Sequence, residues 1–206
     1  MSDISESELQ DYATYFADEH YLVRRKVLKL MGGAFHVYNT AGEVVMYSKM
    51  KAFKLKEDIR LYTGEDMTKE LLCISARSVL DFGATYDVID SGSGVKVGAL
   101  RRKAMKSILK DEWLILGAND QEIGKIVEDS TLKAVLRRFV DFAALLMPQK
   151  YHVEMDEQTL TTMQQNFNPF VYKLDVDFSG DGAFRLDRRL GMAAAILLAA
   201  IEGKQS

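Results

Sequence analysis

Carboxylates near the end of the chain have the spacing of a calcium-binding loop. Positions 1, 3, 5, 6 and 7 of an EF-hand loop would be Asp175, Asp177, Ser179, Gly180 and Asp181. Position 12 of such a loop supplies a bidentate Glu, but here it is Leu186. Because the segment before the loop has the pattern of a strand, we expect a solvated turn that leads into a helix. Asp175, Asp177 and Asp181 are an incomplete calcium set, and no resident metal is predicted.

A basic segment is the second group of residues with possible chemistry. It contains five cations and no acid before Asp111, and the cations are Arg101, Arg102, Lys103, Lys106 and Lys110. A phosphate or anionic headgroup suits such a cluster, since each basic side chain near an anionic membrane contributes about 1 kcal/mol. The alternative is an exposed sheet edge that lysines keep from pairing with other chains. Both interpretations stay open.

Catalytic motifs are missing from the sequence. The three histidines, His20, His36 and His152, belong to no metal-binding motif and flank no nucleophile motif. The single cysteine, Cys73, lies in an apolar run and is expected to be a small core residue. No P-loop, GxGxxG or GxSxG pattern is present. We predict a protein that is not an enzyme and that uses no cofactor.

Composition favours a globular cytoplasmic protein. A chain of 206 residues with 48% hydrophobic content is long enough for one domain with a sizeable core. A formal net charge of -3 does not indicate a nucleic-acid-binding protein. A single cysteine fits a reducing compartment, and the acidic N-terminus has no secretory signal pattern. We expect residues 1–19 to form an arm or short helix and residues 20–206 to form the domain.

Strand and turn signals recur at intervals of about 8 to 12 residues from Tyr21 onward, as in a β-sandwich or barrel. Gly32-Gly33 is predicted to form a two-residue turn, and further turns are expected at 40–42, 91–94 and 118–120. Side chains two positions apart lie on the same face of a strand. Four expected hairpins begin with such an aromatic–aliphatic pair, which should point to a shared interior: Phe35/Val37, Tyr86/Val88, Trp113/Ile115 and Tyr151/Val153.

Two apolar segments break the strand pattern and are expected to be helices. The first covers 130–147, and its apolar surface over 132–147 would pack on the end of the barrel or in a dimer, with an interfacial membrane helix as the alternative. The second runs from Leu190 to Ile201 without a charge. A membrane-spanning helix needs about 20 residues. Because a helix that is apolar on all sides must be surrounded, its small residues predict a helix threaded through a closed barrel.

Several motifs resemble the LURP-one-related and phospholipid scramblase group of the tubby C-terminal superfamily. They are YLVRRKVLKLMGGAFHVYNTAGEVV near the start, KVGALRRK, DEWLIL and EIGKIVED in the middle, and DVD, FRLD and the small-residue apolar helix at the end. The resemblance covers residues 20–203 and implies a mainly β fold, a closed antiparallel barrel of about 12 strands wrapped around the C-terminal helix. The helix at 130–147 is not part of the common pattern, and the Pro- and Cys-rich arm of animal scramblases is missing.

Function is unsettled within that group, in which tubby domains bind phosphoinositides and scramblases are associated with lipid movement. The fold alone therefore does not decide the activity. The first hypothesis is a non-enzymatic cytoplasmic domain, peripheral to a membrane, that binds an anionic lipid headgroup through residues 101–110. The alternative is an interaction or scaffold protein that pairs with itself or with a protein partner through the helix at 132–147. Lipid scrambling is a further alternative, although no segment is long enough to span a bilayer.

Overall fold

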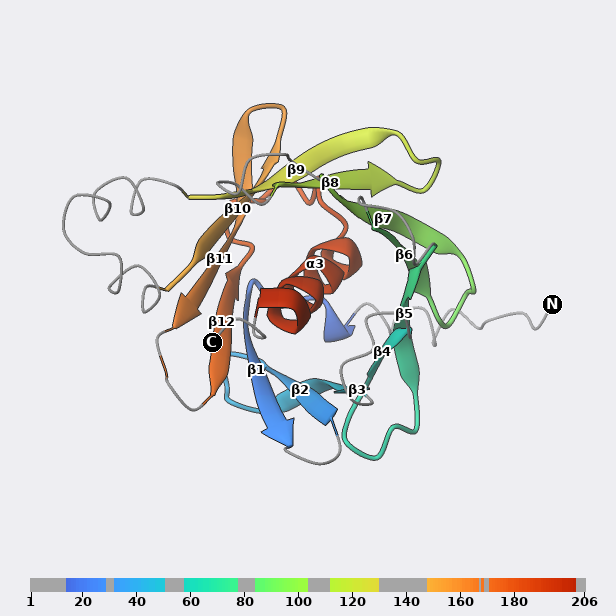
Figure 1. The fold of residues 1–206 in the computed structure, drawn as a ribbon, viewed down its shortest axis with the longest axis vertical. Helices are drawn as coiled ribbons and strands as arrows, with labels where there is room; N and C mark the ends of the chain where they lie inside the picture. The colour runs from blue at the N-terminus through green and yellow to red at the C-terminus, as the bar shows by residue number, and fades with distance from the viewer. Residues whose placement is uncertain are drawn as a thin grey trace.

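A computed structural model shows twelve antiparallel strands that close into one barrel around a helix (Figure 1). The structure describes residues 14–28, 32–50, 58–77, 84–103, 112–129, 148–166, 168 and 171–202. Within these ranges the elements are β1 (His20–Leu28), β2 (Gly32–Tyr38), β3 (Val44–Met50), β4 (Ile59–Tyr62), β5 (Glu70–Ala76), β6 (Thr85–Asp90), β7 (Lys96–Arg102), β8 (Glu112–Gly117), β9 (Glu122–Glu128), β10 (Lys150–Met155), β11 (Gln158–Asn166), β12 (Tyr172–Asp177) and α3 (Arg188–Glu202). Each strand pairs with its neighbours in sequence, and β1 pairs with β12 to close the ring. The predicted barrel with a central helix is confirmed.

The aromatic–aliphatic pairs face the interior, as their spacing predicts. All eight side chains are buried in one core cluster with α3, and they are Phe35, Val37, Tyr86, Val88, Trp113, Ile115, Tyr151 and Val153. They belong to β2, β6, β8 and β10, which run in the same direction around the barrel. In each pair the aromatic residue therefore lies nearer than its aliphatic partner to the end of the barrel at which these strands begin.

The helix α3 fills the barrel, and its first turn is fixed by carboxylates. Every residue from Leu190 to Ile201 is buried. The side chain of Asp187 accepts a hydrogen bond from the backbone N–H of Arg189 at 2.9 Å, so it caps the helix. Arg189 also pairs with Asp90 of β6 at 2.8 Å, which ties the helix start to the barrel wall. None of the described helices is long and apolar enough to cross a membrane.

One cation of β1 is enclosed by the barrel. Arg24 is exposed, whereas Arg25 is only 2% exposed, as strand alternation predicts for consecutive residues. The guanidinium of Arg25 lies 6.0 Å from the Phe35 ring centroid, and its Nη1 donates to the carbonyl of Ala199 at 3.5 Å. Burial lowers the pKa of Arg25. Arg25 therefore places a positive charge at the negative C-terminal end of α3.

One turn prediction is wrong, and two predicted elements cannot be assessed. Gly32 and Gly33 do not form the first hairpin turn, because they pair with Leu28 and Val27 inside the β1–β2 ladder. The turn signal of consecutive glycines is local, whereas the observed register ends β1 at Leu28 and includes both glycines in β2. The expected helix at 130–147 lies outside the described residues, as does most of the expected N-terminal arm.

Any side chain at Gly191 of α3 is predicted to lower the stability of the protein. A Cβ at this position would lie 2.5 Å from Cε1 of the buried Phe178 ring. We expect Gly191→Ala to lower the free energy of unfolding by about 1–3 kcal/mol, because overpacking outweighs the higher helix propensity of alanine. Urea denaturation measures the change. Gly182→Ala is the control, since a Cβ there meets nothing within 4 Å, and equal stability of the two variants would contradict the packing argument.

Candidate functional site

The end of the barrel at which α3 begins is acidic. The connections at this end are 14–19, 39–43, 63–69, 91–95, 118–121, 156–157 and 178–187. They contain two basic residues, Lys69 and Arg185, and ten acidic residues, namely Asp18, Glu19, Glu43, Glu65, Asp66, Asp120, Asp156, Glu157, Asp181 and Asp187. We call this end the acidic end.

The opposite end, at which α3 ends, is basic. At this end we consider the two terminal residues of each strand and the next residue along the chain where the structure describes it. These positions hold four acids: Asp58, Glu112, Glu128 and Asp129. The same positions hold eight bases, which are Lys49, Arg60, Arg77, Arg101, Arg102, Lys103, Lys150 and Lys173. We call this end the basic end. Arg77 and Asp120 pair with each other on the outer face, but without these two the described residues still give the two ends opposite net charge, although the whole chain is nearly neutral.

The predicted anion-binding segment begins at the basic end. Arg101 donates from Nε to the hydroxyl oxygen of Thr85 at 3.2 Å, so its charge is not neutralised by this contact. Lys103 instead pairs with Glu112 at 2.6 Å, which removes much of its attraction for another anion. Of these two cations, Arg101 is therefore the one whose charge is less compensated by the described carboxylates. The other two predicted cations, Lys106 and Lys110, lie outside the described residues.

Arg102 lies at the mouth of the barrel rather than on its outer face. It follows Gly98 and Leu100 on the side of β7 that faces α3, and it is half-buried. Tyr86 lies close enough to be affected by the charge of Arg102. Burial raises the pKa of Tyr86, and the positive charge of Arg102 offsets part of that rise. Consecutive residues of the basic segment therefore have different surroundings.

Two cations also face each other across the seam where the barrel closes. Arg24 of β1 is in register with Lys173 of β12. Like charges directly opposite each other destabilise a sheet. Within the described ranges, Arg24, Arg101, Lys150 and Lys173 take part in no ion pair. Their charges are therefore available to an external anion, and sequence spacing did not reveal Arg24 and Lys173 as neighbours.

A separate charged cluster on the outer face neutralises itself. Arg77 pairs with Asp87 at 2.6 Å and also with Asp120, while Lys96 lies 2.7 Å from Asp120 and 3.2 Å from Asp87. The hydrogen bonds from Arg77 and Lys96 lower the pKa of Asp120 to about 2. Two cations and two carboxylates balance, so this cluster offers no net charge to a ligand.

The calcium-like loop uses its carboxylates to hold its own backbone. Asp181 is 1% exposed, and its two oxygens accept the backbone N–H groups of Arg185 at 2.8 Å and Leu186 at 2.9 Å. Asp177 accepts the N–H of Ser179 at 2.8 Å. These hydrogen bonds hold the backbone of the loop in its conformation.

Asp175, the remaining calcium candidate, points elsewhere and accepts a hydrogen bond from the amide of Asn166 at 2.5 Å. Among the described residues, no group of three or more His, Cys, Asp or Glu side chains is placed to hold a metal ion.

The titratable residues that could serve catalysis have ordinary partners. Cys73 is buried, and burial is the main reason that its pKa rises to about 11, so its thiol stays protonated at neutral pH. His36 Nε2 lies 2.7 Å from a carboxylate oxygen of Glu65, and His152 Nε2 lies 3.6 Å from one of Asp129. Both histidines lie within strands, as expected.

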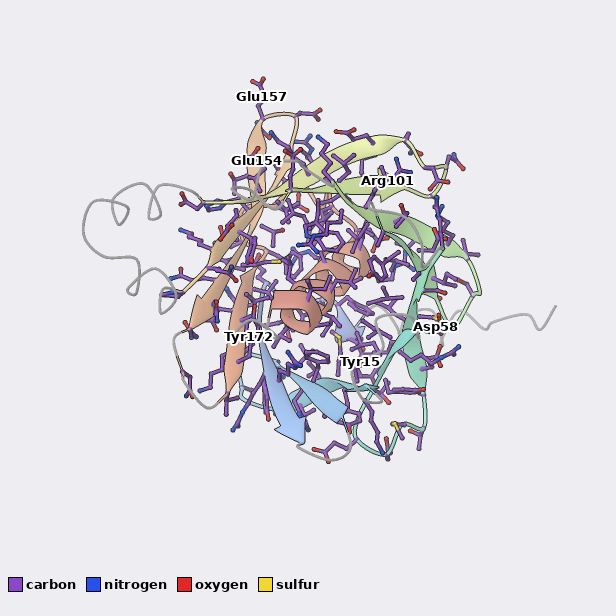
Figure 2. The ribbon with its side chains drawn as sticks, viewed as in Figure 1. Tyr15, Asp58, Arg101, Glu154, Glu157 and Tyr172 are labelled. Atoms are coloured by element: carbon purple, nitrogen blue, oxygen red, sulfur yellow. The ribbon has the colours of Figure 1, made fainter. Side chains whose placement is uncertain are left out.

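A surface depression of about 440 Å³ lies at the acidic end, between β9 and the β10–β11 hairpin. Its lining consists of Glu122, Ile123, Gly124, Lys125, Glu154, Asp156 and Glu157. Figure 2 shows Glu157 at the tip of this hairpin and Glu154 lower on the same hairpin. A Cβ on Gly124 would lie 2.6 Å from the carbonyl oxygen of Glu154, so glycine allows the close approach of the two strands. We call this feature the acidic depression, and sequence spacing did not predict it.

Comparison with known proteins does not identify a family. No protein-family model matches the chain, and no curated protein matches it. The resemblance of its motifs to the LURP-one-related and scramblase group therefore stays a prediction.

Asp181 is predicted to be structural rather than a calcium ligand. We expect Asp181→Ala to lower the free energy of unfolding by about 1–3 kcal/mol, because two buried N–H groups lose their acceptors. Urea denaturation with EDTA and with CaCl₂ measures the effect, and the loss should be the same in both. Asp175→Ala is the control, with a smaller loss expected at its exposed site. A wild-type protein that calcium stabilises, and an Asp181→Ala variant that calcium does not, would contradict this role.

Proposed function

We propose that the protein is a non-enzymatic, cytoplasmic domain whose basic end docks on an anionic, phosphate-bearing membrane surface. The observation that carries this proposal is the separation of charge between the basic end and the acidic end. A nearly neutral protein with this arrangement would be attracted to an anionic surface in one orientation, with the basic end toward the lipid. In this proposal the partner is a lipid headgroup, and neither a cofactor nor nucleic acid is involved.

The spread of the cations favours a surface over a single small anion. Arg101, Lys150 and Lys173 lie on β7, β10 and β12, so they are distributed around the barrel rim. A membrane presents many phosphates in one plane, and each basic residue near it contributes about 1 kcal/mol. Cations that do not converge on one point can therefore still act together. Residues 104–111 would add Lys106 and Lys110 from the sequence of the same segment.

The sequence resemblance agrees with a lipid ligand and is itself part of the proposal. The scaffold hypothesis depends on the segment 132–147, which lies outside the described residues, and no observation here favours it. Lipid scrambling likewise has no observation in its support.

Co-sedimentation with liposomes tests the proposal. The wild-type protein should sediment with vesicles of phosphatidylcholine and phosphatidylserine, but not with phosphatidylcholine alone, and binding should fall as salt rises. Arg101→Ala/Lys150→Ala should lower the partition coefficient about tenfold or more, because two cations near the surface are removed.

Lys69→Ala/Lys96→Ala is the matched control, since it removes the same charge from the other side of the barrel: Lys69 lies in a connection of the acidic end, and Lys96 begins β7 next to another such connection. Its binding should stay within about twofold of wild type. Equal losses in the two double variants would show that only net charge matters and would contradict docking through the basic end. Failure of the wild type to bind anionic vesicles would overturn the proposal.

A further inference from the structure

The large hydrophobic side chains that are exposed among the described residues all lie at the acidic end, each on or next to a different connection. In the described part of the chain, four large hydrophobic residues are exposed, and they are Val44, Met67, Val95 and Phe184. Val44 begins β3 directly after a connection of the acidic end, and the other three lie within such connections. Turns are ordinarily polar, so apolar tips on several of them are a feature of this end that its acidic composition does not explain.

Phe184 is the most prominent of these side chains. It is 70% exposed and has a φ of 51°, a left-handed conformation that is rare for a bulky residue. The guanidinium of Arg188 lies 5.2 Å from its ring centroid and 4.5 Å from that of the buried Phe178. Arg188 is itself buried, and the carbonyl of Asp18 accepts a hydrogen bond from its Nη1 at 3.2 Å. The Phe184 ring is therefore held in place while its outer face meets solvent.

The Phe184 loop is attached to the acidic depression. Arg185, the next residue, forms an ion pair with Asp156 and donates to the side chain of Gln158 at 2.8 Å. Asp156 lines the depression. A cation–π contact of Phe184 and an ion pair of Arg185 thus fix the loop that carries the exposed ring, and the ion pair ties this loop to a residue that lines the acidic depression. We call Phe184 and the acidic depression together the docking face.

We propose that the docking face binds a basic amphipathic segment of a partner protein. Lysine or arginine side chains of that segment would enter the acidic depression, where Glu122 and Glu157 offer carboxylates. The other two carboxylates of the lining are already paired, Glu154 with Lys125 at 3.2 Å and Asp156 with Arg185. An apolar residue of the segment would pack on Phe184. Charge complementarity requires that the partner segment be positively charged, and a pre-positioned aromatic ring lowers the conformational entropy lost on binding.

This inference does not rest on the proposed membrane function. The docking face lies at the acidic end, and the lipid would be bound at the basic end. A protein lying on a membrane by its basic end would present the docking face to the cytoplasm, so the two activities are compatible. Loss of either one would leave the other intact.

Fluorescence anisotropy with a labelled cationic amphipathic peptide tests the proposal. The probe is a helix-forming peptide of Lys and Leu, and oligolysine of equal charge is the comparison. The full chain should bind the Lys/Leu peptide at least tenfold more tightly than oligolysine, since the apolar contact adds to the charge attraction. Phe184→Asn should remove most of that difference, because Asn tolerates the left-handed φ but lacks the apolar ring. Thermal denaturation checks that this variant folds.

Two double variants distinguish binding at the docking face from a general electrostatic attraction to the acidic end. Glu122→Gln/Glu157→Gln should weaken Lys/Leu peptide binding about fivefold or more. Glu43→Gln/Glu65→Gln removes the same charge from other turns and should change it less than twofold. Oligolysine that binds as tightly as the Lys/Leu peptide, unchanged binding by the Phe184→Asn variant, or equal effects of the two charge pairs would each overturn the proposal.

A second copy of the chain is the competing occupant, because its basic end is also complementary to the docking face. Sedimentation velocity of the protein alone distinguishes it. A monomer at micromolar concentration and low salt supports a separate partner. A self-association that Phe184→Asn abolishes would assign the face to another copy and overturn the proposal of a basic partner segment.

Discussion

Burial of α3 is the constraint on which the rest of the molecule depends. A helix that is apolar on every side has no stable place in water, and a closed sheet needs something to fill its interior. The barrel removes the apolar helix from water, and the helix fills the interior of the barrel. The fit is close, because a Cβ on Gly98 of β7 would lie 3.0 Å from Cδ2 of Leu190, and one on Gly191 would meet Phe178. Only a thin helix of small residues can occupy this barrel.

The charges follow from the direction of that helix. Its positive N-terminal end lies at the acidic end and its negative C-terminal end at the basic end, so the macrodipole and the charged residues stabilise each other. Arg188 and Arg189 oppose this trend at the start of α3. Arg189 is compensated by Asp187 and Asp90, and Arg188 lies against the Phe178 ring. The separation of charge between the two ends is thus partly a consequence of the helix direction in the barrel. It gives the acidic end and the basic end different potential partners.

The sequence was informative where the pattern was periodic. The alternation around Phe35, Tyr86, Trp113 and Tyr151 predicted the core, and the charge-free run from Leu190 predicted the central helix, because burial leaves a direct mark on residue type. The glycines at 32 and 33 led to a wrong turn prediction, because a local turn signal does not specify the residue at which strand pairing ends.

The candidate sites were harder to predict because they join residues that are distant in sequence. Arg24 and Lys173 become neighbours only when β12 closes the ring, and Arg77 meets Asp120 only through the curvature of the sheet. The acidic depression depends on the approach of β10 to Gly124. The one available signal was the acidity of the turns, which becomes visible once alternate connections are assigned to the same end of a barrel.

Hydrogen–deuterium exchange on anionic vesicles tests the central claim most directly, because it reports which end meets the membrane. The account predicts slower exchange at residues 100–103 and 148–151 on binding, with no change in the turns 39–43, 63–69 and 91–95. Protection of those turns, with the basic end unaffected, would show that the charge separation does not orient the protein as proposed.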